Sequence, residues 1–361
     1  MDDFISQDYA ALAAAAGPDA ELQRVRALEA EGRAEEALGL LRQGAAAGSV
    51  TLRTELAKRT FLDPSLPPDD GLLAVVTAAN DGGAEAAHLV AMLAGAGLGM
   101  RQSWPSALVY LQRSAELGFV PAQRQLSLLA PGHGTVSGTD GWRRLRESVS
   151  LSGLLNPPRP RVQSIAPRIG IVERFLAPEL CDWLIEKARP TLTPAQTFDR
   201  ETGARIYESG RTNSAAHFNV PDFDVILALV RARIAAVTGL PVHGLEATAV
   251  LHYSPGQEFA PHFDFLDTES PGYAQNVAAE GQRVLTFLVY LNEDFDGGET
   301  DFPALGWRYK GRKGDALFFW NVDQSGKPDQ RTYHAGVATS SGEKWLLSQW
   351  VRLPIARPAT P

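Results

Sequence analysis

Cysteine is almost absent from this sequence of 361 residues, in which Cys181 is the one thiol. A single cysteine excludes an intramolecular disulfide, so the fold depends on its core and its hydrogen bonds. Cys181 lies next to Trp183 in a helical pattern. We therefore expect a small buried apolar side chain there, rather than a nucleophile or a metal ligand.

Long apolar runs and excess positive charge are missing as well. No stretch approaches the roughly 18 uninterrupted apolar residues of a membrane span, so no contact with a membrane is expected. The acidic start MDDFISQDYA lacks the basic and apolar regions of a signal peptide, which makes the cytoplasm the expected location. The formal net charge is -8, and this acidic balance argues against nucleic acid as a partner.

The length of the chain exceeds one ordinary core and predicts more than one domain. Its first part is rich in Ala, Leu and Gly at helical spacing, in segments that read as helix, glycine turn, helix. The turn glycines are Gly48, Gly82 and Gly118, spaced by 34 and 36 residues. Glycine suits the left-handed end of a helix because it has no Cβ. This period predicts α-helical repeats over residues 1–130.

These segments resemble tetratricopeptide-like repeats of the Sel type over about residues 20–130. Such repeats stack helix pairs into a short solenoid with a concave face. That face would bind a peptide or protein, or the repeats would be a helical cap that stabilises the neighbouring domain, and the sequence favours neither. Residues 131–164 are expected to be a linker with one candidate helix, because they are rich in turn residues and proline.

Residues 165–361 are expected to form a second domain. A helix is expected over residues 222–239, with Asp222 as its N-cap and Gly239 just after its end. Later runs such as RVLTFLVYLN and KWLLSQWVRL are separated by turns and read as strands. The fold class is therefore α+β. An N-terminal α-helical repeat domain precedes a double-stranded β-helix (jelly roll) with flanking helices.

A histidine and a carboxylate stand two residues apart in the segment LHYSPGQEFAPHFDF. Residues two apart on a strand share a face, so His262 and Asp264 can bind one metal ion. If the run around His334 lies beside them, two histidines and one carboxylate form the facial set that is typical of non-haem Fe(II) oxygenases. Lys344 follows on the next predicted strand, where a buried ammonium would pair with the distal carboxylate of 2-oxoglutarate.

Further motifs around these residues follow a known order. The stretch over residues 165–353 resembles the prolyl 4-hydroxylase family. The matching pieces are Arg211-Thr212-Asn213-Ser214, Glu246, Tyr253 with Gly256-Gln257, His262 with Asp264, Arg283 with TFLVYLN, Gly297-Gly298-Glu299-Thr300, Gly314-Asp315-Ala316-Leu317, His334-Ala335-Gly336, Gly342-Glu343-Lys344-Trp345 and Gln349-Trp350-Val351. So many short motifs in one order make the resemblance specific.

The resemblance implies an Fe(II)- and 2-oxoglutarate-dependent dioxygenase that uses O2 and releases succinate and CO2. It would hydroxylate a peptidyl residue, with proline as the first expectation, so the partner would be a proline-containing peptide or protein. The implied iron ligands are His262, Asp264 and His334, the 2-oxoglutarate contacts Lys344, Thr300 and Tyr253, the residues lining the catalytic cleft Arg283 and Trp350, and the substrate contacts Arg211, Ser214 and Glu246. Ascorbate is a further expected cofactor.

One residue departs from the family pattern. Phe259 stands where tyrosine is common, so one hydrogen bond to substrate is missing. Two alternatives therefore stay open: the same chemistry on a different residue or a small molecule, and a non-catalytic interaction protein that acts through its repeats. The intact triad with Lys344 favours an enzyme. Between the expected iron strand and the next strand, the long polar stretch 266–282 predicts a mobile lid.

Overall fold

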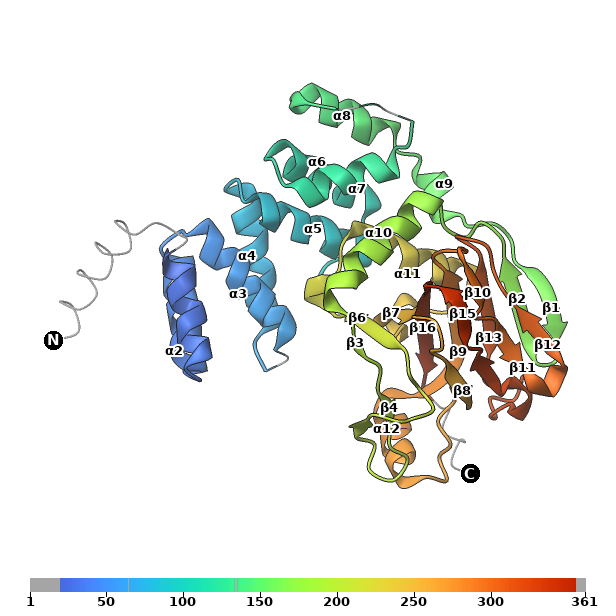
Figure 1. The fold of residues 1–361 in the computed structure, drawn as a ribbon. Coiled ribbons are helices and arrows are strands. Elements are labelled where there is room, and N and C mark those ends of the chain that lie inside the picture. Colours follow the sequence, from blue (N-terminus) through green and yellow to red (C-terminus); the bar gives the residue numbers. More distant parts are fainter. Residues whose placement is uncertain (1–19, 64, 133, 135, 355–361) are drawn as a thin grey trace, which may run out of the picture. The chain divides into compact units, whose positions relative to one another are not determined.

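The computed structural model describes residues 20–63, 65–132, 134 and 136–354 (Figure 1). By its internal contacts the chain divides into two compact units, and each unit is discontinuous in sequence. The first unit comprises residues 1–151 and 220–229, and the second comprises residues 152–219 and 230–361. Helix α11 (Val225–Thr238) is consequently divided between the two units.

The first unit is built from helices joined by short turns. Its helices are α2 (Ala34–Ala46), α3 (Val50–Leu62), α4 (Pro68–Asn80), α5 (Ala84–Ala96), α6 (Trp104–Glu116), α7 (Val120–Leu129) and α8 (Gly138–Ser148). The turns after α2, α4 and α6 contain Gly48, Gly82 and Gly118, whose φ angles are 97°, 93° and 90°. A side chain with a Cβ would be strained at such angles, so the predicted helix–glycine–helix pattern is confirmed. The kinship with Sel-type repeats stays a prediction.

The first unit also holds the beginning of α11. The buried side chain of Gln125 accepts the backbone N–H of Val225 at 3.1 Å, and its amide nitrogen lies 2.8 Å from Nε2 of His88. The N-cap expected at Asp222 was wrong. That residue lies in a 3-10 turn, and the carboxylate of Asp224 accepts the N–H of Leu227 at 2.8 Å instead. The 3-10 turn covers Val220–Asp222, so Asp222 cannot cap the α-helix. The α-helix therefore begins later than expected, at Val225.

The second unit is dominated by antiparallel strands. The larger sheet has the order β1-β2-β13-β9-β16-β7-β6-β3, and a smaller sheet has the order β12-β11-β14-β8. Their strands are β1 (Arg161–Ile165), β2 (Arg168–Val172), β3 (Thr193–Pro194), β6 (Ser214–Phe218), β7 (Thr248–Tyr253), β8 (Phe259–His262), β9 (Gln282–Tyr290), β11 (Thr300–Phe302), β12 (Trp307–Tyr309), β13 (Ala316–Trp320), β14 (His334–Gly336) and β16 (Lys344–Leu353). Two short pairs join β4 (Thr197–Phe198) to β5 (Arg205–Ile206) and β10 (Phe295–Gly297) to β15 (Thr339–Gly342).

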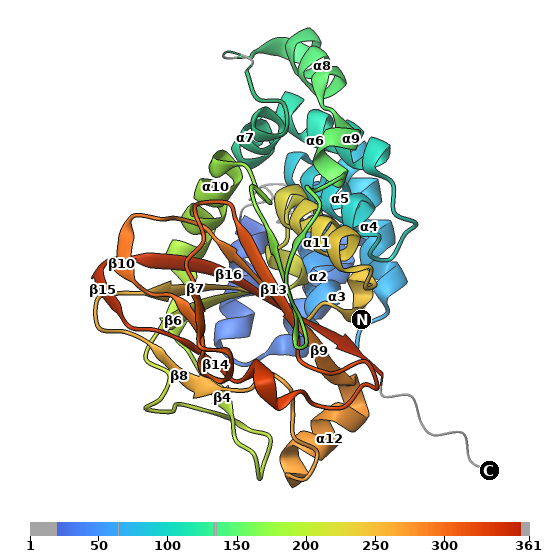
Figure 2. The same cartoon turned by 90° about the vertical axis from the view of Figure 1, so that its right-hand side faces the viewer.

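The core of this unit lies between the larger and the smaller sheet. It combines side chains of the larger sheet, such as Tyr253 and Leu346, with Phe302 of the smaller sheet. Helix α10 (Pro178–Ala188) contacts β6 and β7 of the larger sheet. The arginine at position 231 in α11 donates to Thr248 and Gln349, whose side chains lie on the sheet face opposite the core. The layers are therefore helix, large sheet and small sheet, which confirms the α+β fold with a jelly-roll core (Figure 2).

The stretch 266–282, expected to be a lid, contains helix α12 (Pro271–Glu280). Its base is closed by Gln282, whose side-chain amide accepts from the N–H of Leu266 and donates to the carbonyl of Leu266, at 2.8 and 2.7 Å. Near the start of the helix, Gly272 donates its N–H to the carbonyl of Arg200 at 3.0 Å. The stretch is thus an ordered element with several attachments.

Within the part of the chain that the structure describes, no helix combines the length and the apolar character needed to cross a membrane.

Candidate active site

Two histidines and one carboxylate converge at the mouth of the core. Strand β14 pairs with β8 so that His334 stands opposite His262. The ligand atoms of His262, Asp264 and His334 all lie within 4.8 Å of one another. Nε2 of His262 is 3.4 Å from one oxygen of Asp264, and Nε2 of His334 is 3.5 Å from the other. The strand ends at His262, so Asp264 lies in the bend that follows and not on the strand itself.

Both imidazoles are oriented by their own backbone. Nδ1 of His262 lies 2.8 Å from the carbonyl of Ala260, and Nδ1 of His334 lies 2.9 Å from the carbonyl of Thr332. A carbonyl accepts, so each Nδ1 carries the proton and each Nε2 keeps its lone pair. Burial, with a smaller effect of His262, lowers the pKa of His334 to about 4. The ring is neutral near pH 7, as a metal ligand must be.

The carboxylate of Asp264 is held by a chain of polar side chains to which the sequence analysis assigns no role. The hydroxyl of Thr286 donates to Asp264 at 2.6 Å and accepts from the amide of Asn321 at 3.0 Å. Burial alone would raise the pKa of Asp264. The two histidines and the Thr286 hydroxyl outweigh burial and keep the pKa below its usual range. The carboxylate is therefore ionised and fixed in direction, as expected of a ligand with supporting contacts.

Lys344 supplies a buried cation on the same side of the larger sheet as Tyr253, its partner across β7 and β16. Its side chain is 1% exposed, and its ammonium lies 4.8 Å from the centre of the Tyr253 ring. Among the described residues, no carboxylate lies within ion-pair distance of it. Burial, opposed in part by Glu299, lowers the pKa of Lys344 to about 7. A buried ammonium in this state favours an anionic ligand.

The hydroxyls near Lys344 differ in their availability. The Tyr290 hydroxyl donates to the carbonyl of Tyr309 at 2.8 Å and lies 2.9 Å from the hydroxyl of Thr300. Tyr290 has one proton, so Thr300 is the donor of that second bond. Tyr253 is buried, and burial raises its pKa to about 12, which keeps its hydroxyl protonated. Sequence reasoning missed Tyr290 because it reads as one more apolar position of a strand.

Gly298 allows the stem of Lys344 to pass close to the backbone. It has a φ of 68°, and a Cβ at this position would come within 3.1 Å of Cδ of Lys344 and 2.9 Å of the Phe295 ring. Both the positive φ and the contacts exclude a larger residue without rearrangement. The Gly297-Gly298 turn therefore has a specific task beside the cation.

The expected substrate residues fall into two groups. Arg211 and Trp350 line one cavity together with the triad, Tyr253, Thr300, Lys344 and Phe259. The Arg211 guanidinium lies 4.5 Å from the centre of the Phe259 ring, and that ring stacks on His262 at 3.6 Å. Ser214 pairs with His252 across β6 and β7, and so faces the side of the sheet away from Tyr253 and the cavity.

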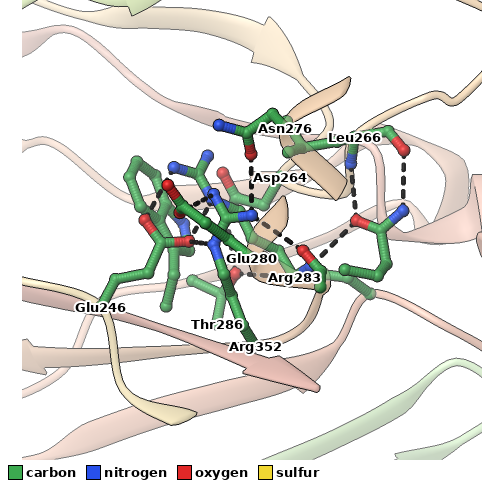
Figure 3. Close-up of polar contacts among 12 residues, drawn as sticks. Glu246, Asp264, Leu266, Asn276, Glu280, Arg283, Thr286 and Arg352 are labelled. Atoms are coloured by element: carbon green, nitrogen blue, oxygen red, sulfur yellow. Dashed lines mark hydrogen bonds and ion pairs between the residues drawn. The ribbon is translucent and has the colours of Figure 1, made fainter. Parts of the chain in front are cut away.

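Glu246 and Arg283 bind each other. Nε and Nη2 of Arg283 donate to the two oxygens of Glu246 at 2.6 and 2.9 Å. The same guanidinium lies 3.5 Å from the centre of the Trp350 ring, so it supports the ring from behind. Burial would raise the pKa of Glu246, but Arg283 and Arg352 outweigh it and hold the pKa below its usual range (Figure 3).

Comparisons with known proteins agree with this geometry. Residues 248–352 match the model of the 2OG-Fe(II) oxygenase superfamily. The chain is 36% identical over 209 residues to prolyl 4-hydroxylase 1 of Arabidopsis thaliana, covering 54% of this chain and 72% of that protein. It is 30% identical over 250 residues to probable prolyl 4-hydroxylase 10 of the same plant, covering 63% of this chain and 84% of that protein.

Among solved structures, the viral collagen prolyl hydroxylase of Paramecium Bursaria Chlorella virus-1, in complex with 2OG, is 27% identical, with a TM-score of 0.40 over 51% of this chain and 95% of that chain. The superfamily model and the plant relatives assign the chain to a class, the dioxygenases that depend on Fe(II), 2-oxoglutarate and O2. Within that class, the chain belongs to the prolyl 4-hydroxylase family.

Proposed function

We propose that this enzyme hydroxylates proline in a peptide or protein, with His262, Asp264 and His334 as its iron ligands. The observation that carries the proposal is one cavity that joins the triad, the buried cation Lys344 and the indole of Trp350. The two Nε2 atoms and the Asp264 carboxylate are the donor set that suits Fe(II) with open positions. Bound Fe(II) with 2-oxoglutarate and O2 supplies oxidative decarboxylation and the oxygen atom that reaches the substrate carbon.

The residues of the chain bind and orient the reactants. We assign the ammonium of Lys344 to the distal carboxylate of 2-oxoglutarate and the hydroxyl of Tyr253 to a hydrogen bond with that carboxylate. Thr300 is a weaker contact in this proposal, because a bound carboxylate would compete with Tyr290 for its proton. Ascorbate and a cytoplasmic location stay predictions from the sequence.

Trp350 is the substrate contact that the geometry supports best. Its ring lines the cavity, and Arg283 supports the other face. Its indole N–H is buried and has no hydrogen-bond partner among the residues described. A flat ring face suits a pyrrolidine, and a substrate carbonyl would satisfy the N–H. Arg211 offers a second donor group to the cavity in the same proposal, whereas Ser214 does not reach it.

The same chemistry on another residue or a small molecule is the second candidate, and Phe259 is the observation that favours it. Its ring has no hydroxyl, although it lies between Arg211 and His262 in the cavity. A substrate that needs no hydrogen bond at this point would fit equally well. A non-catalytic role is excluded by the family assignment together with the complete triad.

Succinate formation tests the proposal directly. Peptides that contain proline in an extended sequence should stimulate succinate release well above the peptide-free rate, and matched peptides with alanine in place of proline should not. Mass spectrometry should find one added oxygen atom on the proline. If proline and alanine peptides stimulate equally, or the added oxygen lies on another residue, the proline assignment is wrong and the second candidate replaces it.

A further inference from the structure

Arg352 lies near the end of β16 and was not among the residues singled out in the sequence. Its side chain is 7% exposed, and each nitrogen of its guanidinium has a partner. Nε donates to Glu246 at 2.6 Å, while Nη1 donates to the side chain of Asn276 and to the carbonyl of Gly281, both at 2.8 Å. Nη2 forms an ion pair of 3.5 Å with Glu280. One side chain thus binds helix α12 and a buried carboxylate (Figure 3).

The carboxylate leads to the cavity. Glu246 uses one oxygen for both Arg352 and Arg283, and the other for Arg283 alone. The guanidinium of Arg283 in turn lies 3.5 Å from the centre of the Trp350 ring, which lines the cavity. Contacts therefore run without interruption from α12 through Arg352, Glu246 and Arg283 to the wall that would face the substrate.

Helix α12 has a second set of attachments on the side of the β4–β5 pair. Gly272 donates to the carbonyl of Arg200, and the hydroxyl of Tyr273 donates to the carbonyl of Phe198, both at 3.0 Å. A Cβ on Gly272 would come within 2.3 Å of the backbone nitrogen of Gly203, so the two segments touch closely. A shift of α12 therefore moves the β4–β5 segment on one side and strains Arg352 on the other.

We propose that Arg352 is a positioning residue that couples the placement of α12, through Glu246 and Arg283, to the wall of the cavity formed by Trp350. The inference rests on the proposed function, since it assigns that wall to the substrate. The planar guanidinium is essential because it binds acceptors in different directions at once, which the single ammonium of lysine cannot reproduce. Arg352 does not line the cavity, so it acts through Glu246 and touches neither cofactor nor substrate.

The first test is Arg352→Lys, which keeps the buried positive charge beside Glu246 and removes the planar guanidinium that binds several acceptors. We expect the KM for a proline peptide to rise about tenfold or more, with the KM for 2-oxoglutarate within about twofold of the wild-type value. The ratio of succinate to hydroxylated peptide should rise, because a displaced Trp350 ring would no longer hold the substrate proline in the correct position. Amide hydrogens of residues 272–281 should exchange at least about tenfold faster, and this readout needs neither iron nor peptide.

Asn276→Ala tests whether Arg352 acts by positioning α12 or only by keeping a buried charge beside Glu246. It removes a contact on the helix side and leaves Arg352 paired with Glu246, so we expect a change in the same direction, of about two- to fivefold in peptide KM. Arg161→Met is the matched control, because Arg161 is exposed on the edge strand β1. It should change neither the kinetic constants nor the exchange of α12.

Two results would overturn the proposal. One is unchanged exchange of residues 272–281 and unchanged peptide KM in Arg352→Lys. The other is an equal loss of peptide affinity, 2-oxoglutarate affinity and thermal stability, which would mean that Arg352 only maintains the fold. Failure of the proline assignment looks different: no proline peptide then stimulates the wild-type enzyme, while the exchange of α12 in wild type and Arg352→Lys still decides whether the tether exists.

Discussion

The two ends of the cavity differ in how their polar groups are satisfied. At the cofactor end, the Nε2 atoms of the two histidines point at Asp264, and Lys344 has no ion pair among the described residues. At the substrate end, Glu246 and Arg283 form a bidentate pair inside the protein. The buried ammonium of Lys344, which lacks an ion pair, is positioned for an anionic ligand, whereas the paired Glu246 and Arg283 support the wall of the cavity.

This difference separates two kinds of functional residue. Removing a group of the cofactor end should abolish or weaken binding of a ligand and leave the fold intact. Removing Glu246 would leave the buried charge of Arg283 uncompensated, which typically costs about 3–5 kcal/mol of stability. Changes at the cofactor end are therefore the cleaner probes of chemistry, and changes at the substrate end need a structural control.

The largest effect is expected at the triad. His262→Ala or Asp264→Ala should reduce Fe(II)-dependent succinate formation to background and leave the melting temperature within a few degrees of wild type, because both side chains line the cavity. His217→Ala, an exposed histidine on β6, should retain full activity. Activity in either triad variant would remove that residue from the ligand set.

Lys344→Ala should have the next largest effect. A charge-assisted hydrogen bond in a buried site contributes about 1.5–3 kcal/mol, which corresponds to a rise of at least about tenfold in the KM for 2-oxoglutarate. Lys327→Ala is the control, since Lys327 is exposed on a loop. If Lys344→Ala binds 2-oxoglutarate as wild type does, another cation must hold the distal carboxylate.

The pH dependence of 2-oxoglutarate binding should follow the same lysine. Burial lowers the pKa of Lys344 to about 7, so the free enzyme loses this charge as the pH rises through that value. The bound dianion favours the charged form, so binding above pH 7 takes up a proton and weakens by up to ~10-fold per pH unit. Calorimetry on the anaerobic Fe(II) enzyme in two buffers measures this proton. A slope that persists in Lys344→Ala would contradict the assignment.

A smaller change should result from restoring a hydroxyl between the two ends. Phe259→Tyr keeps the stack on His262 and adds a donor to the cavity. One hydrogen bond of about 0.5–1.5 kcal/mol lowers the KM for a proline peptide by about two- to tenfold. Phe263→Tyr, whose ring packs on Phe265 and Tyr333, is the control. If Phe259→Tyr leaves the peptide KM unchanged, no substrate acceptor lies near this ring.

The smallest effect is expected in the first unit, where no catalytic group is proposed. A groove of about 340 Å³ there is lined by residues of α2, α3 and α4, including Leu73, which is 70% exposed. If the repeats bind a protein substrate, Leu73→Glu should raise the KM for a whole protein a few-fold and leave that for a short peptide unchanged. Val109→Glu on α6 is the matched control. If Leu73→Glu changes the KM for the whole protein and for the short peptide by the same factor, the repeats have a purely stabilising role.

Local spacing was enough to select His262 and Asp264 as candidate metal ligands and to predict the turn glycines. His262 and Asp264 are two residues apart, and the glycines follow predicted helices at a regular period, so short windows carry the information. The start of α11 was missed because a 3-10 turn and Asp224 compete with the pattern beginning at Asp222. The exact residue at which a helix begins depends on small energy differences, and tertiary packing decides between them.

The supporting contacts could not be predicted in this way. Thr286 donates to Asp264 and accepts from Asn321, and these three residues are tens of positions apart, so their meeting depends on strand register. Register is set by the packing of the whole sheet. Arg352 was invisible for the same reason, because its partners Glu246, Asn276 and Gly281 come from separate segments. Sequence motifs therefore select candidate reacting groups more readily than the groups that support them.

The division of α11 has a practical consequence for dissecting the protein. Residues 220–229 belong with the repeats, although they lie in the middle of the oxygenase sequence. A truncation that begins after residue 151 would retain these residues and remove Gln125, the side chain that accepts the N–H of Val225. Expressed alone, the C-terminal segment would expose apolar surface of α11 and be prone to aggregate. Loss of activity in such a fragment would thus report on folding, and point substitutions are the appropriate way to assign a role to the repeats.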